Sequence, residues 1–559
     1  MEASSTPTPE PVEQPSSGES APPQRNPLPN VGDILFVLML YLMLFTLPNF
    51  LLGDGSTGWH LVTGNWIIDN HQIPRTDIMS YTFPDKPWVA YEWLFDVILA
   101  GFERIGGLPL VAVAIATCIA GLFTLLYQSC RKAGCYFLTA MWLCLIGSIV
   151  SSIHWLARPH IVTFFGLYVY ATLLEDYYRG LASTKKLLLV LGLFMIFWVN
   201  CHPAFLAGFV LIGIYWFSAL IVRFVNSNPE SRTRSQKQLK DFSLALAVAV
   251  AASFVNPYGI ELYKYVWEYL HQGVVLAANT EFMSPTFHGG LQPTCLEFLY
   301  FLLCLGLATS TKKPTLPQFL AVLAFAHLSL SSVRSGPFFV IVALPFIGEQ
   351  LGNSRLRDLV PGVFEPTNIL DKLNAFLKRI GDTFDEQEFS CTMHILPIVV
   401  VLFLSVSCLN GGKLFGVQIV KSTFDAKTKP YATLDYLEKN KMWDQRGVNY
   451  DNWGGYLRYK TGHRVFIDDR SDFYGEKFYL EYGAMSVLEP GWQNVLDKYK
   501  IDWVIYPKGG ALAEGLKETG KWRVAAEDQA SEVFVRKEPL TAVPNNAIPN
   551  KEQGSLPQK

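Results

Sequence analysis

Long apolar runs separated by short polar breaks dominate residues 31–410 of this chain. An α-helix needs about 20 apolar residues to cross the hydrocarbon core of a bilayer. The pattern therefore predicts a polytopic α-helical membrane domain with about eleven transmembrane helices. The runs cover residues 32–52, 94–128 (one span with a leading amphipathic turn), 136–154, 160–178, 186–201, 204–223, 241–256, 294–310, 315–332, 336–351 and 391–410.

Basic residues gather in every second break between these runs. Cytoplasmic loops carry an excess of Lys and Arg, so this alternation predicts a cytoplasmic N-terminus and an external C-terminal region. We expect a multi-pass protein of a cytoplasmic (inner) membrane. The basic clusters are Arg25; Arg131 and Lys132; Arg179, Lys185 and Lys186; residues 223–240; Lys312 and Lys313; and residues 355–379.

The breaks on the predicted outer side have a different character. Each carries a proline, which ends or kinks a helix, and several hold a single Arg or His. Such a residue at a membrane edge is costly unless it faces a protein interior or a wet cavity. We therefore predict that these breaks converge on a polar site. They are the large first outer loop 53–92 and residues 155–160, 200–203, 256–293 and 332–337.

Amphipathic stretches within the breaks predict additional short helices. Residues 57–70 and 259–280 alternate aromatic or aliphatic positions with polar ones, which is typical of helices that lie in the membrane interface. A third amphipathic helix is expected at residues 367–380, inside the inner loop 352–390.

Composition agrees with a membrane protein. Half of the 559 residues are apolar and only 17% are charged, which is too apolar for an ordinary soluble protein. The net charge of −2 gives no argument for a nucleic-acid partner. The nine cysteines show neither a CxxC pair nor a metal-ligand spacing, so we expect no zinc site and no disulfide framework.

The two ends of the chain differ from its centre. Residues 1–30 are rich in Pro, Ser and Glu and lack the features of a cleaved signal peptide, so we expect a disordered tail. Residues 411–540 have a soluble composition, and residues 541–559 return to a polar tail that we also expect to be disordered.

Strands alternate with helices in residues 411–540, which predicts a small soluble α/β domain on the outer face. The acidic cluster Asp468, Asp469 and Asp472 could hold a metal, but solvated loop charges are the favoured interpretation. Helices are expected at 431–440, 475–485, 492–499 and 511–519, and strands at 448–450, 464–467, 503–506, 523–526 and 532–536.

Asp54 follows the first apolar run directly, and we predict that it is catalytic. A carboxylate at this membrane edge could act as a general base or orient the reacting groups electrostatically. The alternative is a structural turn residue, because Asp-Gly is a strong turn dipeptide.

Arg158 and Arg334 lie in two other outer breaks and are predicted to bind substrate, because arginine binds phosphate bidentately. The alternative is that each snorkels to the lipid headgroups. The remaining predicted substrate-binding residues are His160, His202, Glu92 and His60. Buried interior histidines, and a structural ion pair for the glutamate, are the alternatives for these.

Several motifs in the outer segments resemble those of bacterial membrane proteins related to the GT-C glycosyltransferases. The resemblance covers most of residues 31–538. Its motifs are Asp54–His60 (DGSTGWH), Gly64–Trp66 (GNW), Ile73–Asp77 (IPRTD), Tyr91–Leu94 (YEWL), Ala157–His160 (ARPH), Asn256–Gly259 (NPYG), Val333–Arg334, Trp453–Tyr456 (WGGY) and Phe466–Arg470 (FIDDR).

The resemblance implies a multi-helix membrane part, a large first outer loop with an essential acid and a soluble outer domain. It also implies a polyprenyl-phosphate-linked sugar as the donor. Asp54 matches the first-loop acid. Metal-using members carry a second acid nearby, whereas Gly55 and Ser56 stand here. We therefore expect no cofactor, and a divalent metal is the less favoured alternative.

Together these features predict an inverting membrane glycosyltransferase that works on the non-cytoplasmic side. The sugar would pass from a polyprenyl-phosphate donor to an unknown glycan, lipid or protein acceptor. One alternative is a non-catalytic membrane protein of the same architecture, with an outer domain that binds a glycan or a partner. A transporter is a second alternative, although transporters place broken helices near the bilayer midplane.

Overall fold

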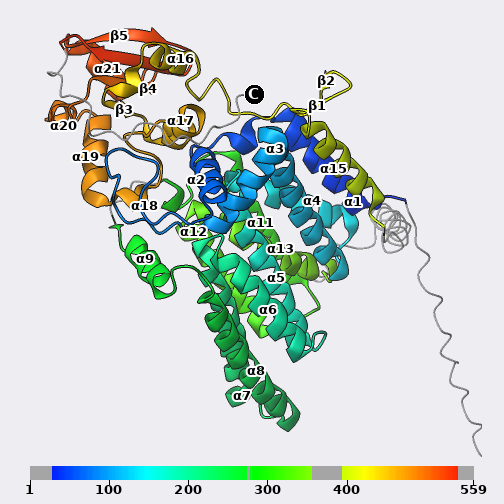
Figure 1. Cartoon of the computed structure of the whole chain (residues 1–559). Helices are drawn as coiled ribbons and strands as arrows, with labels where there is room; N and C mark the ends of the chain where they lie inside the picture. The colour runs from blue at the N-terminus through cyan, green and yellow to red at the C-terminus, as the bar shows by residue number, and fades with distance from the viewer. Residues whose placement is uncertain (1–27, 274–276, 278–279, 355–392, 539–559) are drawn as a thin grey trace, which may run out of the picture.

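The computed structural model describes residues 28–273, 277, 280–354 and 393–538. Each of the predicted apolar runs forms a helix, and these helices pack side by side in one bundle (Figure 1). They are α1 (Val31–Tyr41, continued by a π-helical turn Leu42–Thr46), α3 (Trp93–Lys132), α4 (Phe137–Ser151), α5 (His160–Arg179), α6 (Thr184–Val199), α7 (Leu206–Val225), α8 (Pro229–Ser253), α11 (Leu291–Thr309), α12 (Leu316–Ser331), α13 (Gly336–Gly352) and α15 (Ile395–Cys408).

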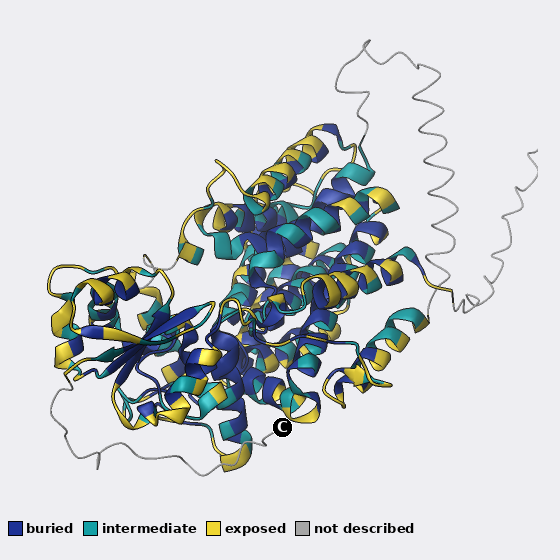
Figure 2. Ribbon diagram, turned by 90° about the horizontal axis from the view of Figure 1, so that it is seen from above, coloured by how far each residue is buried: buried dark blue, intermediate teal, exposed yellow. Residues whose placement is uncertain are grey.

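The chain is a multi-pass membrane protein. Among the described residues, five helical segments are long and apolar enough to cross a bilayer: 93–132, 137–154, 203–225, 291–309 and 333–352. Large apolar side chains such as Trp142, Leu193 and Phe301 are exposed on the outside of the bundle, as expected for surfaces that face lipid. Helix faces turned away from the bundle are yellow in Figure 2, and its interior is dark blue. The full count of eleven spans stays a prediction.

Helix α3 is broken by two glycines. Gly106 and Gly107 leave the helical conformation, and Gly107 has a φ of 66°, which a residue with a Cβ rarely adopts. The segment before this break is the amphipathic turn expected from the sequence, and it begins directly after Glu92. Glu92 directly precedes α3 and Asp96 lies in its first turn, and both border a cavity shared with residues of the C-terminal domain. The end of the bundle that carries this domain is called the C-domain end below (Figure 1).

Helix α2 (Ser56–Asn70) is not the interfacial helix expected from residues 57–70. It packs between α3 and α17 (Gly454–Thr461) of the C-terminal region, so its polar and apolar sides are both buried. A Cβ on Gly58 would collide with the backbone of Gly455, which shows how closely the two segments approach. The expectation was wrong because the C-terminal region covers the face that would otherwise meet water.

The second predicted interfacial stretch contains α9 (Ile260–Leu270). Its exposed apolar residues, Trp267 and Ile260 among them, suit a helix at a membrane surface. The predicted helix 367–380, residues 1–27 of the N-terminal tail and the tail 541–559 lie outside the described residues.

A mixed four-stranded sheet forms the centre of the C-terminal region, in the order β3-β4-β6-β5. β3 runs parallel to β4, and β6 is antiparallel to both of its neighbours. The strands are β3 (Gly447–Asn449), β4 (Trp503–Pro507), β5 (Trp522–Glu527) and β6 (Ser531–Arg536); the helices are α16 (Ala432–Lys439), α17, α18 (Ser471–Tyr474), α19 (Glu476–Ser486), α20 (Trp492–Lys498) and α21 (Ala511–Glu518). An unpredicted short hairpin, β1 (Lys413–Leu414) and β2 (Val417–Gln418), follows α15.

The predicted strand 464–467 is not part of this sheet. Val465 instead forms an isolated parallel bridge with Ser80 of the first outer loop. The Tyr81 amide donates to the Val465 carbonyl at 2.9 Å, and the Val465 amide donates to the Met79 carbonyl at 3.1 Å. The segment is extended because it pairs with this distant loop, which no local pattern could reveal. The loop and the C-terminal domain thus share one hydrophobic core.

Candidate functional site

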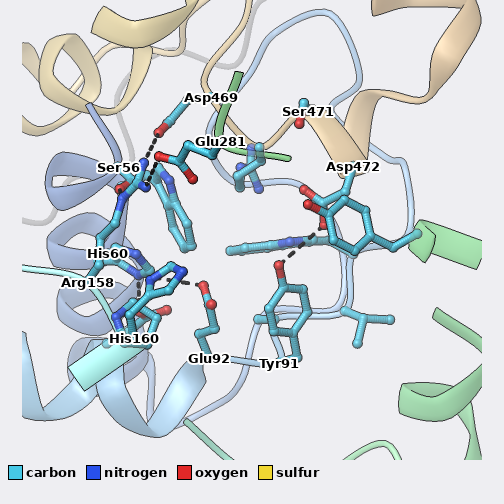
Figure 3. Close-up of a pocket in the computed structure, with 18 of the residues that line it drawn as sticks. Ser56, His60, Tyr91, Glu92, Arg158, His160, Glu281, Asp469, Ser471 and Asp472 are labelled. Carbon is cyan, nitrogen blue, oxygen red and sulfur yellow. Dashed lines mark hydrogen bonds and ion pairs between the residues drawn. The ribbon is translucent and has the colours of Figure 1, made fainter. Parts of the chain in front are cut away.

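A polar cavity of about 130 Å³ lies where the first outer loop, the start of α5 and the C-terminal domain meet (Figure 3). Charged and aromatic side chains from segments far apart in the sequence surround it. The lining residues with polar groups include Ser56, His60, Tyr91, Glu92, Asp96, Arg158, His160, Glu281, Arg334, Asp469, Arg470 and Asp472. Five of the seven predicted site residues therefore border one cavity. The two that do not are Asp54 and His202.

Arg158 is the cation around which acids gather. Its Nε contacts the Asp54 carboxylate and lies 2.6 Å from the Ser56 hydroxyl. Its Nη1 is 3.5 Å from Glu281, and its Nη2 is 3.8 Å from Asp469, toward which it points in Figure 3. Burial lowers the pKa of Arg158, but the surrounding carboxylates outweigh burial and raise it. The guanidinium therefore stays charged.

Asp54 lies behind Arg158 rather than on the wall of the cavity. It follows a short 3-10 helix (Phe50–Leu52), and its carboxylate is held by Arg158 and the Ser56 hydroxyl. The Ala157 amide donates to the Leu51 carbonyl at 2.8 Å, which ties the two breaks together. This geometry suits an acid that fixes the orientation of the arginine.

Arg334 approaches from the opposite side, on the turn before α13. Its Nη1 is 3.6 Å from Glu281, and its Nη2 is 2.7 Å from His160 Nε2. The guanidinium carbon lies 5.0 Å from the centre of the Phe282 ring, a cation–π distance. Glu281 is therefore shared by both arginines, at distances longer than those of a tight ion pair.

Behind Arg334 three histidine rings lie in contact, and those of His154 and His160 are stacked. The His160 ring lies 4.3 Å from that of His154 and 4.5 Å from that of His202. His202 Nδ1 is 2.7 Å from the Thr163 hydroxyl. Burial, and then the charge of Arg334, lower the pKa of His202, so this ring is neutral. His202 thus supports His160 from behind. His154 was missed by the sequence analysis, although it directly precedes a predicted polar break.

His60 and Glu92 form the wall on the bundle side. His60 Nδ1 is 2.6 Å from Asp96 and 4.0 Å from Glu92. Burial, and then Arg158, lower the pKa of His60. Burial, and then Asp472, raise the pKa of Glu92. The sequence analysis also missed Asp96. It lies in the first turn of α3, and the only sign of a function was the free-energy cost of a charged residue in an apolar run.

The sequence analysis favoured solvated loop charges for the acidic cluster of the C-terminal domain, and this interpretation was wrong. Asp468 is fully buried, and Asp469 and Asp472 line the cavity. Asp472 accepts a hydrogen bond from Tyr265 of α9 at 2.6 Å. Burial, and then the charge of Asp54, raise the pKa of Asp469. The motif FIDDR drew attention to these residues only through the resemblance.

Four buried polar atoms of residues that line the cavity have no hydrogen-bond partner among the described residues: Trp59 Nε1, His160 Nδ1, Asp469 Oδ1 and Arg470 Nη1. Buried polar groups are nearly always satisfied, so orphaned atoms around a cavity indicate an absent water or ligand. In the described part of the chain, no group of three or more His, Cys, Asp or Glu side chains is arranged to hold a metal. The cation among these acids is Arg158 itself.

Solved structures share this arrangement of helices and outer domain. The apo oligosaccharyltransferase of Archaeoglobus fulgidus superposes with a TM-score of 0.53 at 12% identity, over 85% of this chain and 69% of that one. The same archaeal oligosaccharyltransferase, AglB, in complex with an inhibitory peptide and a dolichol-phosphate gives a TM-score of 0.54 over the same shares, again at 12% identity. The chain has the GT-C fold. No protein-family model and no curated protein matches the sequence of this chain.

Proposed function

We propose that the protein is a membrane glycosyltransferase that takes a sugar from a polyprenyl-phosphate donor and passes it to an acceptor on the non-cytoplasmic side. The observation that carries this proposal is the pair Arg158 and Arg334, which converge on one cavity from separate breaks between helices. Two guanidinium groups fit a lipid phosphate, because each can bind phosphate oxygens bidentately. The AglB complex with dolichol-phosphate supports a lipid phosphate as the ligand type for this fold.

In the proposed reaction, the bond between the sugar C1 and the phosphate oxygen breaks as the acceptor oxygen bonds to C1 from the opposite face. Arg158 and Arg334 stabilise the charge that develops on the departing polyprenyl phosphate. Asp469 Oδ1 takes the proton of the acceptor hydroxyl. A base works best when its pKa lies near the working pH, and the raised pKa of Asp469 fits this role.

Asp54 acts through its neighbours in this scheme. It holds Arg158 and contributes the negative charge that raises the pKa of Asp469. This revises the role expected from the sequence, in which Asp54 itself contacts the acceptor hydroxyl. His160, backed by His202, orients Arg334, while Glu92 and His60 shape the wall on which the sugar would lie.

The decisive experiment measures binding of polyprenyl phosphate, because every donor of this class would release it. Purified protein in nanodiscs is titrated with undecaprenyl phosphate, and the variant Arg158→Gln/Arg334→Gln is compared with wild type. Arg75→Gln is the control, since Arg75 is exposed at the same end of the protein and does not line the cavity. We expect the double variant to lose at least tenfold in affinity, about 1.4 kcal/mol, and the control to be unchanged.

Equal binding by the double variant and the wild type would overturn the proposal. A panel of labelled polyprenyl-phosphate sugars then separates catalysis from binding. Transfer or hydrolysis of one donor supports the enzyme. Binding without turnover of any donor supports the non-catalytic alternative, which one observation favours: the carboxylates around Arg158 already compensate its charge without a ligand.

A further inference from the structure

A second cavity lies at the far end of the bundle, opposite the C-domain end. Its volume is about 330 Å³, larger than that of the candidate site and within the range of small-molecule sites. It opens between α3, α5, α7, α12 and α13. Helix α5 connects the two cavities: it begins at His160 beside the candidate site and ends at Arg179 beside this one.

The side of the cavity toward the membrane centre is apolar, and a network of charges closes its end. Leu211, Ala321, Ile341 and Val342 are among its apolar lining residues. At the closed end, Arg179 donates to both oxygens of Glu349 at 2.8 Å and to Glu175 at 2.5 Å, and Lys312 lies 2.6 Å from Glu349. The two carboxylates and the two cationic side chains give this network no net charge, so it needs no ligand.

Two further charges on the same cavity are not balanced in this way. Lys132, an exposed residue at the end of α3, and the half-buried Asp176 on α5 both line the cavity, and neither forms an ion pair with any described residue. They do not pair with each other. The cavity thus offers one cation and one anion, placed on different helices, next to an apolar wall.

We propose that this cavity binds a phospholipid whose headgroup carries both a phosphate and a primary amine. The phosphate would contact Lys132, the ammonium group would contact Asp176, and the acyl chains would follow the apolar wall toward the bilayer. An anionic lipid would form an ion pair only with Lys132. It would leave the Asp176 carboxylate without a cationic partner, which disfavours its binding. This inference uses no residue of the proposed catalytic site and does not depend on the proposed function.

Native mass spectrometry of the full-length protein tests the proposal. The protein is titrated with phosphatidylethanolamine, phosphatidylcholine and phosphatidylglycerol of matched acyl chains, and with soluble phosphoethanolamine. We expect phosphatidylethanolamine to be retained best, by about tenfold over the other two lipids, because it alone carries a charged N–H donor for the carboxylate. The ammonium of phosphatidylcholine has no N–H, and the headgroup of phosphatidylglycerol offers only neutral hydroxyl donors.

The variants separate the two charges. Asp176→Asn should abolish the preference for phosphatidylethanolamine over phosphatidylglycerol. Lys132→Gln should weaken the binding of both phosphatidylethanolamine and phosphatidylglycerol. Ala171→Leu, which fills the cavity without changing charge, should weaken all three. Lys185→Gln is the control, because Lys185 is an exposed lysine at the same end and does not line the cavity.

Three outcomes would overturn the proposal. Equal retention of the three lipids by the wild-type protein would remove the case for a zwitterion with a primary amine. An equal effect of Lys185→Gln and Lys132→Gln would show that only surface charge matters. Competition by soluble phosphoethanolamine as strong as that by the lipid would assign the cavity to a soluble ligand.

Discussion

Two buried arginines at the same end of the protein, Arg470 and Arg158, are both surrounded by acids, but they are held in very different ways. Arg470 Nη2 lies 2.7 Å from Asp77 and 2.7 Å from Asp468, and these three side chains are at most 3% exposed. Asp77 comes from the first outer loop and Asp468 from the C-terminal domain. The Arg470 cluster, as we call these three residues, therefore joins the two.

The Arg158 cluster consists of Arg158, Asp54, Glu281 and Asp469. Only Asp54 is in close contact with the guanidinium, while the other two acids are at 3.5 and 3.8 Å. Their side chains are 15–23% exposed. This cluster faces the cavity and has room to exchange a carboxylate for another anion. Arg470 also borders the cavity, but its short contacts with fully buried carboxylates indicate a structural cluster. The longer, shared contacts of Arg158 indicate a binding site.

The largest effect is expected from breaking the closed cluster. Arg470→Met leaves two buried carboxylates without a cation, and loss of one partner of a buried pair costs about 3–5 kcal/mol. We expect a large drop in the melting temperature and faster proteolysis of the segment joining α15 to the C-terminal domain. Arg536→Met is the matched control: its partner Asp497 is 55% exposed, so the cost should be below about 1 kcal/mol. Equal melting temperatures for the two variants would contradict the structural role.

The second effect is on activity. Asp54→Asn should reduce transfer by about 10²-fold or more, within the range for loss of one group that stabilises transition-state charge, while the melting temperature stays close to wild type. Because Asp54 raises the pKa of Asp469, the ascending acidic limb of the residual pH–rate profile, where the base loses its proton, should move to lower pH. Asp69→Asn, at an exposed acid of α2, is the control.

An unchanged product yield in Asp54→Asn would refute any role for this acid. Complete loss of the titrating limb, in place of its shift, would make Asp54 itself the base. The same profile measured on Asp469→Asn separates the two assignments, because that variant should lose the limb.

The fold could be predicted from the sequence to the extent that local pattern decides it. The length of each apolar run predicted the helices of the bundle, because the cost of burying unpaired backbone in lipid acts on each segment separately. The faces of α2 and the extended segment at Val465 could not be predicted. Both depend on contact between the first outer loop and a domain almost 400 residues later, and periodicity carries no information about such pairs.

The candidate site shows the same division. Arg158, Arg334 and His160 were expected near one another because each is a costly polar residue in a break at the same face. Asp469 was assigned to a set of solvated loop charges, which was favoured over a metal site for this acidic cluster. Only the three-dimensional structure shows that this loop borders the cavity and that Asp54 forms an ion pair with Arg158.

A smaller effect should come from Glu281→Gln. The Glu281 carboxylate lies between Arg158 and Arg334, where the proposed lipid phosphate would bind. Its neutralisation removes a competing anion, so undecaprenyl phosphate should bind about fivefold more tightly, roughly 1 kcal/mol. Glu261→Gln, on α9 at the same end, should leave the affinity unchanged. Weaker binding in Glu281→Gln would show that Glu281 positions the arginines for phosphate and does not compete with it.

The smallest effect concerns how stability depends on pH. Asp77 of the Arg470 cluster and Asp469 of the Arg158 cluster should change the stability in opposite directions as pH rises. Burial would raise the pKa of Asp77, but Arg470 and hydrogen bonds from Ser80 and the Met79 amide lower it below 3.8. Its contribution to stability is therefore present above pH 3.8 and is lost as pH falls through the lowered value.

Asp469 behaves in the opposite way. Its pKa is raised above 3.8, so its contribution is fully present below that pH and is lost as pH rises through the raised value. The melting temperature should thus decline by about 2–4 °C on the alkaline side, roughly 1 kcal/mol, and Asp469→Asn should flatten this decline without changing the acid side. A decline that persists unchanged in Asp469→Asn would mean that another buried acid of the cavity, with Glu92 first among them, carries the titration.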